Sequence, residues 1–589
     1  MKKYLYSTKI VLLLCMLTLI GWSSTFIPAA QKDHTPVLTT PVDDLLETEL
    51  HKQEELESGA TRIIDPQSLE ELEIDRVAGV LDCTVTHLGS LAFKHALRHP
   101  TTNHTYLAQL QHAIRNLLDN PQLAEKLTQL LTTMKEIEPM LTVLLFSQDS
   151  IYDATTQQIT PMPPLTCINS ILELILSKEA SNLLLPIDKA RTIQSPLGLN
   201  LAFAGLTAAD FALGIGIPFY WAYHNILKAF IEGTLLTPAT YIAPLLIAGR
   251  DFWQRYKTTG LVKEHLKALF TYVEQLRAIN TLLKENSYLF DVFPGLKFVT
   301  TFVERPEELS VNMRKISAHD GKISWLPSGT WCTYNTVKTE QKTMQLIFRT
   351  IGMLDFVLSL ATLYKKFQTA RVHFCFVTYQ RPGLCGLHVR NAWHPLLDPE
   401  TVVMNDIVLG SNDTASKMIL TGPNKGKSTT LKLVALMELF ASTITIVPAS
   451  VAWLPIVDYI GVNTTTVVPD GVSESQAEIA RMKTILDSVA ALTSDRISLT
   501  VFDRLLRMED LAKTYNHSIA HGLVKYPNNI SIIATNNPTL KALEQDTQGA
   551  FVNFKITRRF TLERGTSSDK YDVPWPGDFL SERMAATAG

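Results

Sequence analysis

Residues 417–432 limit the possible fold more than any other stretch of this chain. An apolar run from Lys417 to Thr421 is followed by a Gly-Pro-Asn turn, and then by a Gly-Lys-Ser-Thr run that starts at Gly426 and opens a helical pattern. This order predicts a strand, a loop and a helix. Such a loop binds phosphate when glycines let backbone N–H groups surround the oxygens at a helix N-terminus. A lysine then reaches the β- and γ-phosphates, and a hydroxyl holds Mg²⁺.

The residues of this loop are our candidates for nucleotide binding. They are Gly422, Pro423, Asn424, Lys425, Gly426, Lys427, Ser428 and Thr429. Only three residues separate Gly422 from Gly426, whereas the usual spacing has four. The loop is therefore one residue short, which leaves open a second interpretation: a helix N-terminus that merely carries a lysine and a serine.

Several short segments around the loop occur in a recognisable order. Ala-Trp-His-Pro-Leu-Leu follows Asn391, Met-Asn-Asp-Ile-Val-Leu-Gly occupies 404–410, Thr-Gly-Pro-Asn precedes the Lys-Ser-Thr, and a Val-Pro-Ala follows at Val447. This order resembles the ATPase domain of the MutS family of DNA mismatch-repair proteins, over roughly residues 385 to 589. The resemblance implies a multidomain fold: an all-α helical core and lever region, followed by an α/β P-loop (ABC-type) nucleotide-binding domain.

The resemblance continues downstream of the loop. Ser473 and Glu478 hold the positions of a family signature, in which the serine points across a dimer at the partner's nucleotide. A serine so far from the loop has no local partner that a helix or strand would demand, so we expect Ser473 to act across a homodimer. Asp503 ends an apolar strand, as a Walker B carboxylate does, and with Ser428 it is our candidate Mg²⁺ ligand.

Three departures from the family pattern affect the chemistry. Arg504 stands where the family has the glutamate that polarises the attacking water, and a cation cannot act as that base. Asn536 replaces a histidine, and the loop is short. We therefore expect ATP and Mg²⁺ to bind weakly and hydrolysis to be impaired. The alternative is a catalytically inactive structural or scaffolding dimer that keeps the MutS ATPase fold.

Composition gives little support to DNA binding by itself. The 589 residues carry a net charge of −3 and a pI near 6.6, without the basic excess typical of nucleic-acid-binding chains. DNA, mismatched or not, is therefore a partner that only the family resemblance implies. Phe302-Val-Glu304 matches the Phe-x-Glu with which mismatch-repair proteins wedge a mispaired base, but it lies in a helical region, so we do not expect this role. The six scattered cysteines indicate neither a disulfide framework nor a metal site.

The N-terminus predicts a membrane association. Three lysines precede an uncharged run from Ile10 to Gln31, as in a signal anchor; export after signal cleavage is the alternative. A second apolar segment, which contains Asp210, predicts either a transmembrane hairpin or a buried helical pair. The predicted divisions are a signal at 1–32, an acidic linker at 33–62, helical core and lever regions at 63–195 and 251–380, the apolar segment at 196–250, and the ATPase domain at 381–589.

Overall fold

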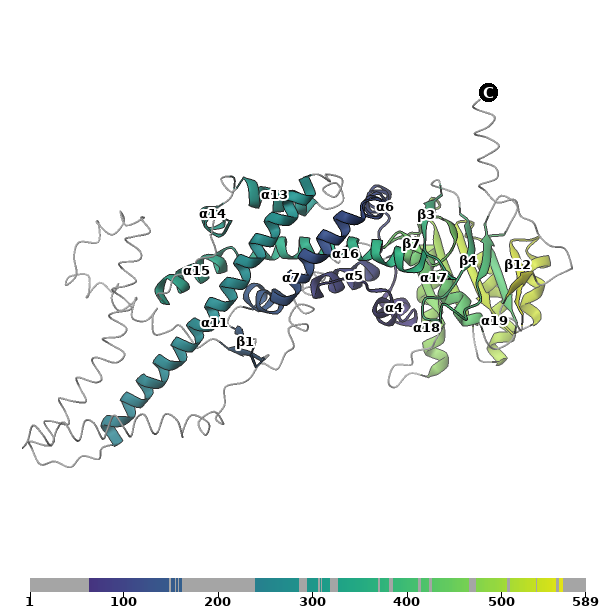
Figure 1. Ribbon diagram of the computed structural model, residues 1–589. Coiled ribbons are helices and arrows are strands. Elements are labelled where there is room, and N and C mark those ends of the chain that lie inside the picture. The colour runs from purple at the N-terminus through teal and green to yellow at the C-terminus, as the bar shows by residue number, and fades with distance from the viewer. Residues whose placement is uncertain are drawn as a thin grey trace, which may run out of the picture. The chain divides into compact units, whose positions relative to one another are not determined.

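The computed structural model describes residues 63–564 with internal gaps (Figure 1). The gaps are 148–149, 154, 157, 162–238, 285–293, 306–307, 309, 318–326, 369–370, 381–384, 411–414, 423–425, 465–472, 506–508, 537 and 558–560. The predicted signal, the acidic linker and most of the apolar segment at 196–250 thus lie outside the described residues. The chain divides into two compact units: the first contains Thr133–Asn280 and Phe298–Ile347, and the second contains Glu54–Thr132, Thr281–Lys297 and Phe348–Gly589.

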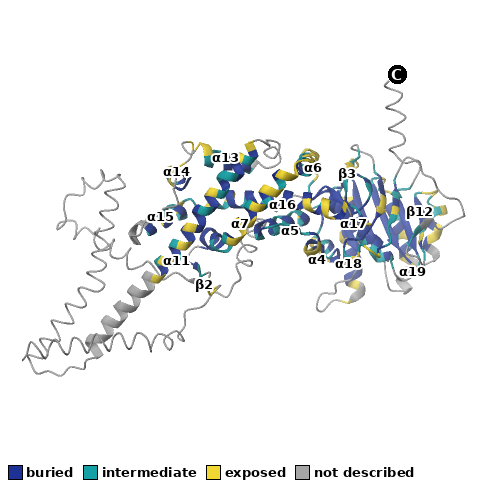
Figure 2. Cartoon of the chain, in the orientation of Figure 1, coloured by how far each residue is buried: buried dark blue, intermediate teal, exposed yellow. Residues whose placement is uncertain are grey.

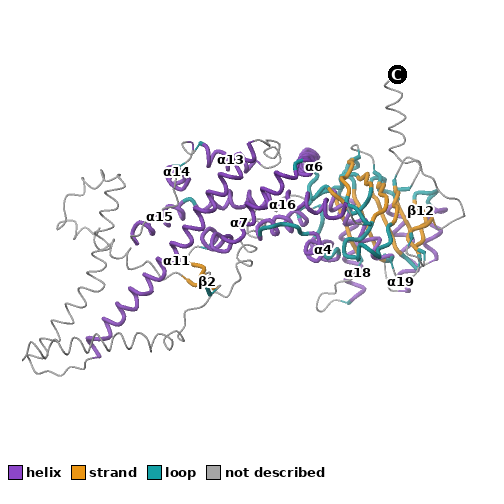
Figure 3. Tube along the Cα trace, viewed as in Figure 1, coloured by secondary structure: helices purple, strands orange, loops and turns teal. Residues whose placement is uncertain are grey.

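Helices form most of the first unit. They are α11 (Ala239–Lys284), most of α13 (Pro294–Glu304), α14 (Val311–Ser317), α15 (Pro327–Thr339), the C-terminal part of α7 (Pro121–Phe146) and the start of α16 (Gln341–Gln368). On α11, fully buried side chains recur every three or four residues, as at Leu266, Leu269, Val273 and Leu276. The all-α prediction missed one element, an antiparallel hairpin of β1 (Ser150–Asp153) and β2 (Gln158–Pro161) (Figure 3).

Phe302 is fully buried within the first unit, so it is not placed to wedge between bases. Its carbonyl accepts a hydrogen bond of 2.6 Å from the hydroxyl of Ser317, and the neighbouring Glu304 accepts one from Asn280 of α11. The Phe-x-Glu match is therefore part of a helix packing interface, in agreement with the expectation from its helical surroundings.

Among the described helices, α16 alone is long and apolar enough to cross a membrane. Its most apolar window has a mean hydropathy of 1.7, and 78% of that window is buried inside the protein (Figure 2). A core helix has this burial, so α16 gives no support to a membrane span.

Four helices begin the described part of the second unit. They are α3 (Pro66–Glu71), α4 (Ile74–Leu81), α5 (His87–Arg98) and α6 (His104–Asp119). The side chains of Asp65, Thr86 and Asn103 each accept a hydrogen bond from the first turn of the helix that follows, which explains where α3, α5 and α6 start. The leucine and isoleucine spacing at 107–117 predicts a helix, and α6 confirms it with Leu107 and Leu110 fully buried.

Asp355 of α16 joins that helix to the N-terminus of α5. Its carboxylate accepts hydrogen bonds from the amide and the hydroxyl of Thr86, both at 2.7 Å, and from the amide of Val85 at 3.1 Å. Burial raises the pKa of Asp355, and the hydrogen bonds from Thr86 act in the opposite direction. The approach is so close that a Cβ on Gly89 would lie 2.1 Å from an Asp355 carboxylate oxygen.

Replacing Gly89 by alanine should therefore destabilise the second unit by about 1–3 kcal/mol, the usual cost of overpacking. The matched control is Gly79→Ala in α4, where a Cβ would meet nothing within 4 Å and should stabilise by up to about 1 kcal/mol. Urea denaturation of both variants measures the two changes in the free energy of unfolding. Shifts of the same sign would show that the contact with Asp355 does not govern this position.

The C-terminal part of the second unit contains two β-sheets. The six-stranded sheet has the order β13-β12-β6-β11-β10-β9, parallel except for β13 at its edge. Its strands are β6 (Lys417–Thr421), β9 (Tyr459–Asn463), β10 (Ser498–Asp503), β11 (Asn529–Ala534), β12 (Phe551–Ile556) and β13 (Leu562–Arg564). The five-stranded mixed sheet has the order β5-β4-β8-β3-β7, with β3 (Cys375–Tyr379), β4 (Leu387–Ala392), β5 (Asn405–Leu409), β7 (Ile446–Val447) and β8 (Val451–Leu454).

Helix α17 (Lys427–Ala441) contacts strands of both sheets and is mostly buried. The remaining helices are α18 (Glu474–Ala490), α19 (Glu509–Leu523), the 3₁₀ turn η4 (Pro538–Ala542) and α20 (Leu543–Asp546). Because β6, β10 and β11 are parallel neighbours, their C-terminal ends meet at one edge, where ligands of α/β sheets commonly bind. The structure confirms the predicted order of a helical region followed by an α/β region.

Candidate nucleotide site

Two glycines shape the turn between β6 and α17. Gly422 has a φ of +135°, and a Cβ there would lie 2.5 Å from the carbonyl oxygen of Ile556 on β12. Gly426 has a φ of +94° and is the N-cap of α17. Both conformations disfavour any residue with a side chain. The predicted strand and helix are confirmed here, while Pro423, Asn424 and Lys425 lie outside the described residues.

Lys427 points back toward the end of β6. Its ammonium donates hydrogen bonds of 2.8 Å to the carbonyl of Gly422 and to Oδ1 of Asn536, and the residue is only 6% exposed. Burial lowers the pKa of Lys427; the negative charge of Asp503 opposes this effect, and the positive charge of Arg504 adds to it. The structure thus brings Lys427 together with residues that follow β10 and β11.

Ser428 and Asp503 lie in direct contact. The serine hydroxyl, in the first turn of α17, donates a hydrogen bond to Oδ2 of Asp503 at the end of β10. A hydroxyl and a carboxylate are oxygen ligands of the kind that Mg²⁺ prefers, so this pair fits the predicted metal role. Thr429, the last residue of the predicted loop, is half-buried in the same turn.

Arg504 follows Asp503 directly and adopts a left-handed backbone with a φ of +71°. Its amide donates a hydrogen bond of 2.9 Å to the carbonyl of Ala534, which holds the chain at this bend between β10 and β11. Arg504 is exposed, and its positive charge is one cause that lowers the pKa of Lys427. The structure thus places a cation near Lys427 and next to Asp503, where the family resemblance implies a carboxylate.

Asn536 is a site residue whose contact the sequence did not predict. It follows Thr535, whose amide donates a hydrogen bond of 2.9 Å to the carbonyl of Leu420 on β6. This pairing brings the asparagine amide against Lys427. The sequence marks the position only as a departure from a family histidine, and the contact depends on the pairing of β11 with β6.

Ser473 has a local structural role that the sequence analysis did not foresee. It is the N-cap of α18, its hydroxyl accepts a hydrogen bond of 3.3 Å from the amide of Gln476, and the Gln476 side chain accepts one from the Ser473 amide. The expectation that Ser473 has no local partner is therefore wrong. Its role across a dimer remains a prediction. Glu478, on the same helix, is buried.

His394, from the His-Pro-Leu segment, is buried near the charges of Lys432, Glu73 and Arg76. Burial lowers its pKa to about 4, with the positive charge of Lys432 as a further cause. Its Nδ1 accepts a hydrogen bond of 3.3 Å from the amide of Leu396, so the buried ring is neutral.

We expect this neutral histidine to make folding pH-dependent. Its pKa is about 4 when folded and about 6.5 when unfolded. The stabilisation is therefore complete above pH 6.5 and is lost as the pH falls toward 4, by up to about 3 kcal/mol. His394→Asn keeps an acceptor for the Leu396 amide but does not titrate. Urea midpoints at pH 7.5 and 5.0 should differ less for this variant than for the wild type; equal differences would contradict the prediction.

Comparison with known proteins finds similarity to MutS proteins that includes the α/β part. Residues 418–562 match the family model of MutS domain V. The DNA mismatch repair protein MutS of Exiguobacterium sp. is 24% identical over 461 residues, which cover 76% of this chain and 50% of the relative. The Endonuclease MutS2 of Lactobacillus helveticus is 38% identical over 155 residues, or 26% of this chain and 18% of the relative. That of Lactiplantibacillus plantarum is 46% identical over 63 residues, 10% of this chain and 8% of the relative.

The chain thus spans about half the length of the MutS relative and a smaller share of the MutS2 proteins. The match over 418–562 contains the β6–α17 turn, Ser473, Asp503 and Asn536. Taken together, the match of residues 418–562 to the model of MutS domain V and the similarity to these relatives support membership of this chain in the MutS family.

Proposed function

We propose that the second unit binds ATP with Mg²⁺ at the turn between β6 and α17. The observation that carries this proposal is the convergence of Lys427, Ser428 and Asp503 at the C-terminal edge of a parallel sheet. Such an edge, with a helix N-terminus pointing at it, is a common site for phosphate groups. The match to MutS domain V supports the same assignment.

Each side chain has a separate task in this proposal. The Lys427 ammonium binds the β- and γ-phosphates, and Asn536 holds that ammonium in place through its Oδ1. Ser428 and Asp503 hold Mg²⁺, which neutralises phosphate charge when bound. The backbone amides at the start of α17, after Gly426, complete the phosphate cradle.

We further propose that hydrolysis is slow. Arg504 occupies the place from which a carboxylate would polarise water, and its guanidinium cannot accept a proton. An inactive scaffold that keeps only the fold is the second candidate, and the same cation supports it. The contacts of Lys427 and Ser428 favour retained nucleotide binding. They bring to one site an ammonium for the phosphates and two oxygen ligands for the metal.

Pairing and DNA binding complete the proposed function. We propose that two copies pair through the nucleotide face, with Ser473 of one copy facing the loop of the other. The names of the relatives, a DNA mismatch repair protein and an endonuclease, support DNA as a partner. The burial of Phe302 argues against its use as a mismatch wedge, so we propose a DNA contact that does not depend on this residue.

Titration of the full chain with a fluorescent ATP analogue tests the proposed nucleotide site. We expect saturable binding that unlabelled ATP displaces and that removal of Mg²⁺ weakens. Signal that excess ATP does not displace would instead support the inactive scaffold.

We also propose that residues 1–32 attach the chain to a membrane, on the basis of the lysines and the uncharged run that follows them. Fractionation of the full chain beside a version that starts at Lys32 tests this. Equal solubility of the two would contradict it.

A further inference from the structure

The first described residues of the second unit pair with the edge of the six-stranded sheet. We call residues 63–73 the N-terminal clasp. The amide of Ile460 on the edge strand β9 donates a hydrogen bond of 2.7 Å to the carbonyl of Ile63, and Ile64 pairs with Ile460 in the parallel sense. The clasp therefore covers an edge of the sheet that would otherwise present unpaired backbone groups.

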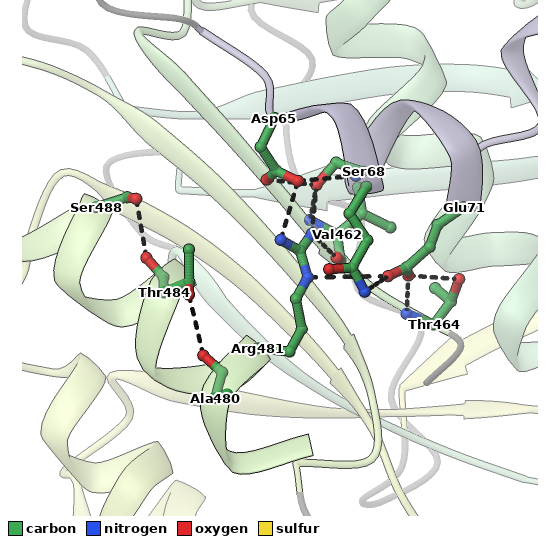
Figure 4. A network of polar contacts seen from close by, with 10 residues as sticks. Asp65, Ser68, Glu71, Val462, Thr464, Ala480, Arg481, Thr484 and Ser488 are labelled. Carbon is green, nitrogen blue, oxygen red and sulfur yellow. Dashed lines mark hydrogen bonds and ion pairs between the residues drawn. The ribbon is translucent and has the colours of Figure 1, made fainter. Parts of the chain in front are cut away.

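A buried arginine of α18 joins that helix to the clasp (Figure 4). The Arg481 guanidinium donates hydrogen bonds of 2.9 Å to the carboxylate of Asp65, 2.7 Å to the hydroxyl of Ser68 and 2.6 Å to the carbonyl of Val462. Its Nε lies 3.8 Å from a carboxylate oxygen of Glu71. The side chains of Arg481 and Glu71 are only 7% and 1% exposed. Removing either one would therefore leave the other as a buried charge without its partner, which is strongly destabilising.

The clasp also holds the C-terminal end of β9. The second oxygen of Glu71 accepts hydrogen bonds from the amide of Thr464, at 2.5 Å, and from its hydroxyl, at 3.2 Å. The Ser68 hydroxyl accepts one of 2.9 Å from the amide of Val462. Thr464 is the last described residue before the connection to Ser473, so Glu71 fixes the point where this connection leaves the sheet.

A further contact reaches the helix of the phosphate loop. Glu73 forms an ion pair of 2.8 Å with Lys432 of α17, and this hydrogen bond is the first cause that lowers the pKa of Glu73. The clasp thus contacts α17 and α18, the two helices whose N-termini carry the candidate nucleotide residues Gly426 and Ser473.

Arg481 and Ser473 lie on the same helix, so contacts of Arg481 affect the position of Ser473. Arg481 lies eight residues after Ser473, about 12 Å along the helix axis. A helix segment of this length is stiff, so the hydrogen bond from Arg481 to the carbonyl of Val462 on β9 limits where Ser473 lies relative to that strand. None of these anchoring carboxylates belongs to the matched domain V at 418–562.

We propose that Asp65, Glu71 and Arg481 are positioning residues for Ser473, so that the clasp supports nucleotide-dependent pairing of two copies. This inference rests on the proposed function of the nucleotide site. Displacing the clasp removes the partners of Arg481, which frees the N-terminus of α18. Each subunit then still binds nucleotide through Lys427, but the two copies pair less well.

The test compares Glu71→Gln and Arg481→Lys in the full chain. Glu71→Gln keeps an oxygen for the Thr464 amide but loses the charge that faces Arg481, while Arg481→Lys keeps the charge and loses the planar fork. The matched control is Arg496→Gln, because Arg496 pairs with Asp458 at 3.3 Å just before the other end of β9, on the surface. Thermal melting identifies any variant that fails to fold, and Glu71→Gln is the milder of the two.

Three readouts separate positioning from general stability. Sedimentation with a non-hydrolysable ATP analogue should show the dimer dissociation constant raised at least about tenfold in both clasp variants, and unchanged in the control. Titration should show nucleotide affinity per subunit within about twofold of the wild type. Amide hydrogen exchange should be faster in the first turns of α18, with or without nucleotide.

The outcomes distinguish two kinds of failure. Wild-type protein that binds no nucleotide would overturn the proposed function, and hydrogen exchange on α18 would still test the clasp. Nucleotide binding and pairing that are unchanged in both clasp variants would overturn the inference alone. Parallel losses of melting temperature, nucleotide affinity and pairing would also overturn it, since they would indicate a purely structural role.

Discussion

Replacing Lys427 by alanine should weaken the binding of MgATP to the full chain by about 10- to 100-fold. The ammonium already lies at the phosphate end of the turn, held by Gly422 and Asn536 at 2.8 Å each, so little rearrangement precedes its contact with a phosphate oxygen. A hydrogen bond to a charged group is worth about 1.5–3 kcal/mol, and about 1.4 kcal/mol corresponds to a factor of ten in affinity. Titration with a fluorescent ATP analogue measures the change.

The control for this experiment is Lys483→Ala. Lys483 also belongs to a helix of the second unit, but its side chain is exposed and pairs with Asp487 at 3.5 Å on the same helix. It should leave the affinity within about twofold of the wild type, since an exposed pair of this kind contributes little. Equal affinities for Lys427→Ala and the wild type would show that nucleotide, if bound at all, does not use the β6–α17 turn.

The sequence predicts the centre of this site because the signals there are local. Two glycines flank a short turn after an apolar strand, and a lysine and a serine open the next helix, so the positions of Gly422 and Lys427 follow from spacing alone. Asp503 is likewise recognisable as a carboxylate at the end of an apolar strand. The structure brings Ser428 and Asp503 into contact because β6 and β10 are both paired with β11 in one parallel sheet.

The sequence does not predict contacts that join distant segments. In the sequence of α18, Arg481 looks like an arginine on the surface of an amphipathic helix. Its partner Asp65 lies 416 residues away, so the sequence does not reveal the contact. For the same reason the helices from residue 66 onward, although predicted as helices, were not expected to share a compact unit with the α/β region. Ser473 is different, because a serine followed three residues later by Gln476 is a local capping signal that the sequence itself contains.

The cation at position 504 should limit the rate of ATP hydrolysis. Without a general base at this position, hydrolysis should be slower by about 10²- to 10⁴-fold than with one. Arg504→Glu alone should recover little turnover, because the short loop separately limits how many backbone amides meet the phosphates. Combining Arg504→Glu with a glycine inserted between Lys425 and Gly426 should produce measurable release of phosphate from ATP.

A second substitution separates the base from the charge. Arg504→Gln removes the cation that lowers the pKa of Lys427 but provides no group that can accept a proton at neutral pH. Paired with the same insertion, it should bind nucleotide without restoring turnover, so any excess rate of the glutamate variant measures the base itself. Ready phosphate release by the wild-type chain, abolished by Lys427→Ala, would mean that water is activated without a carboxylate at 504 and that the short loop is functional.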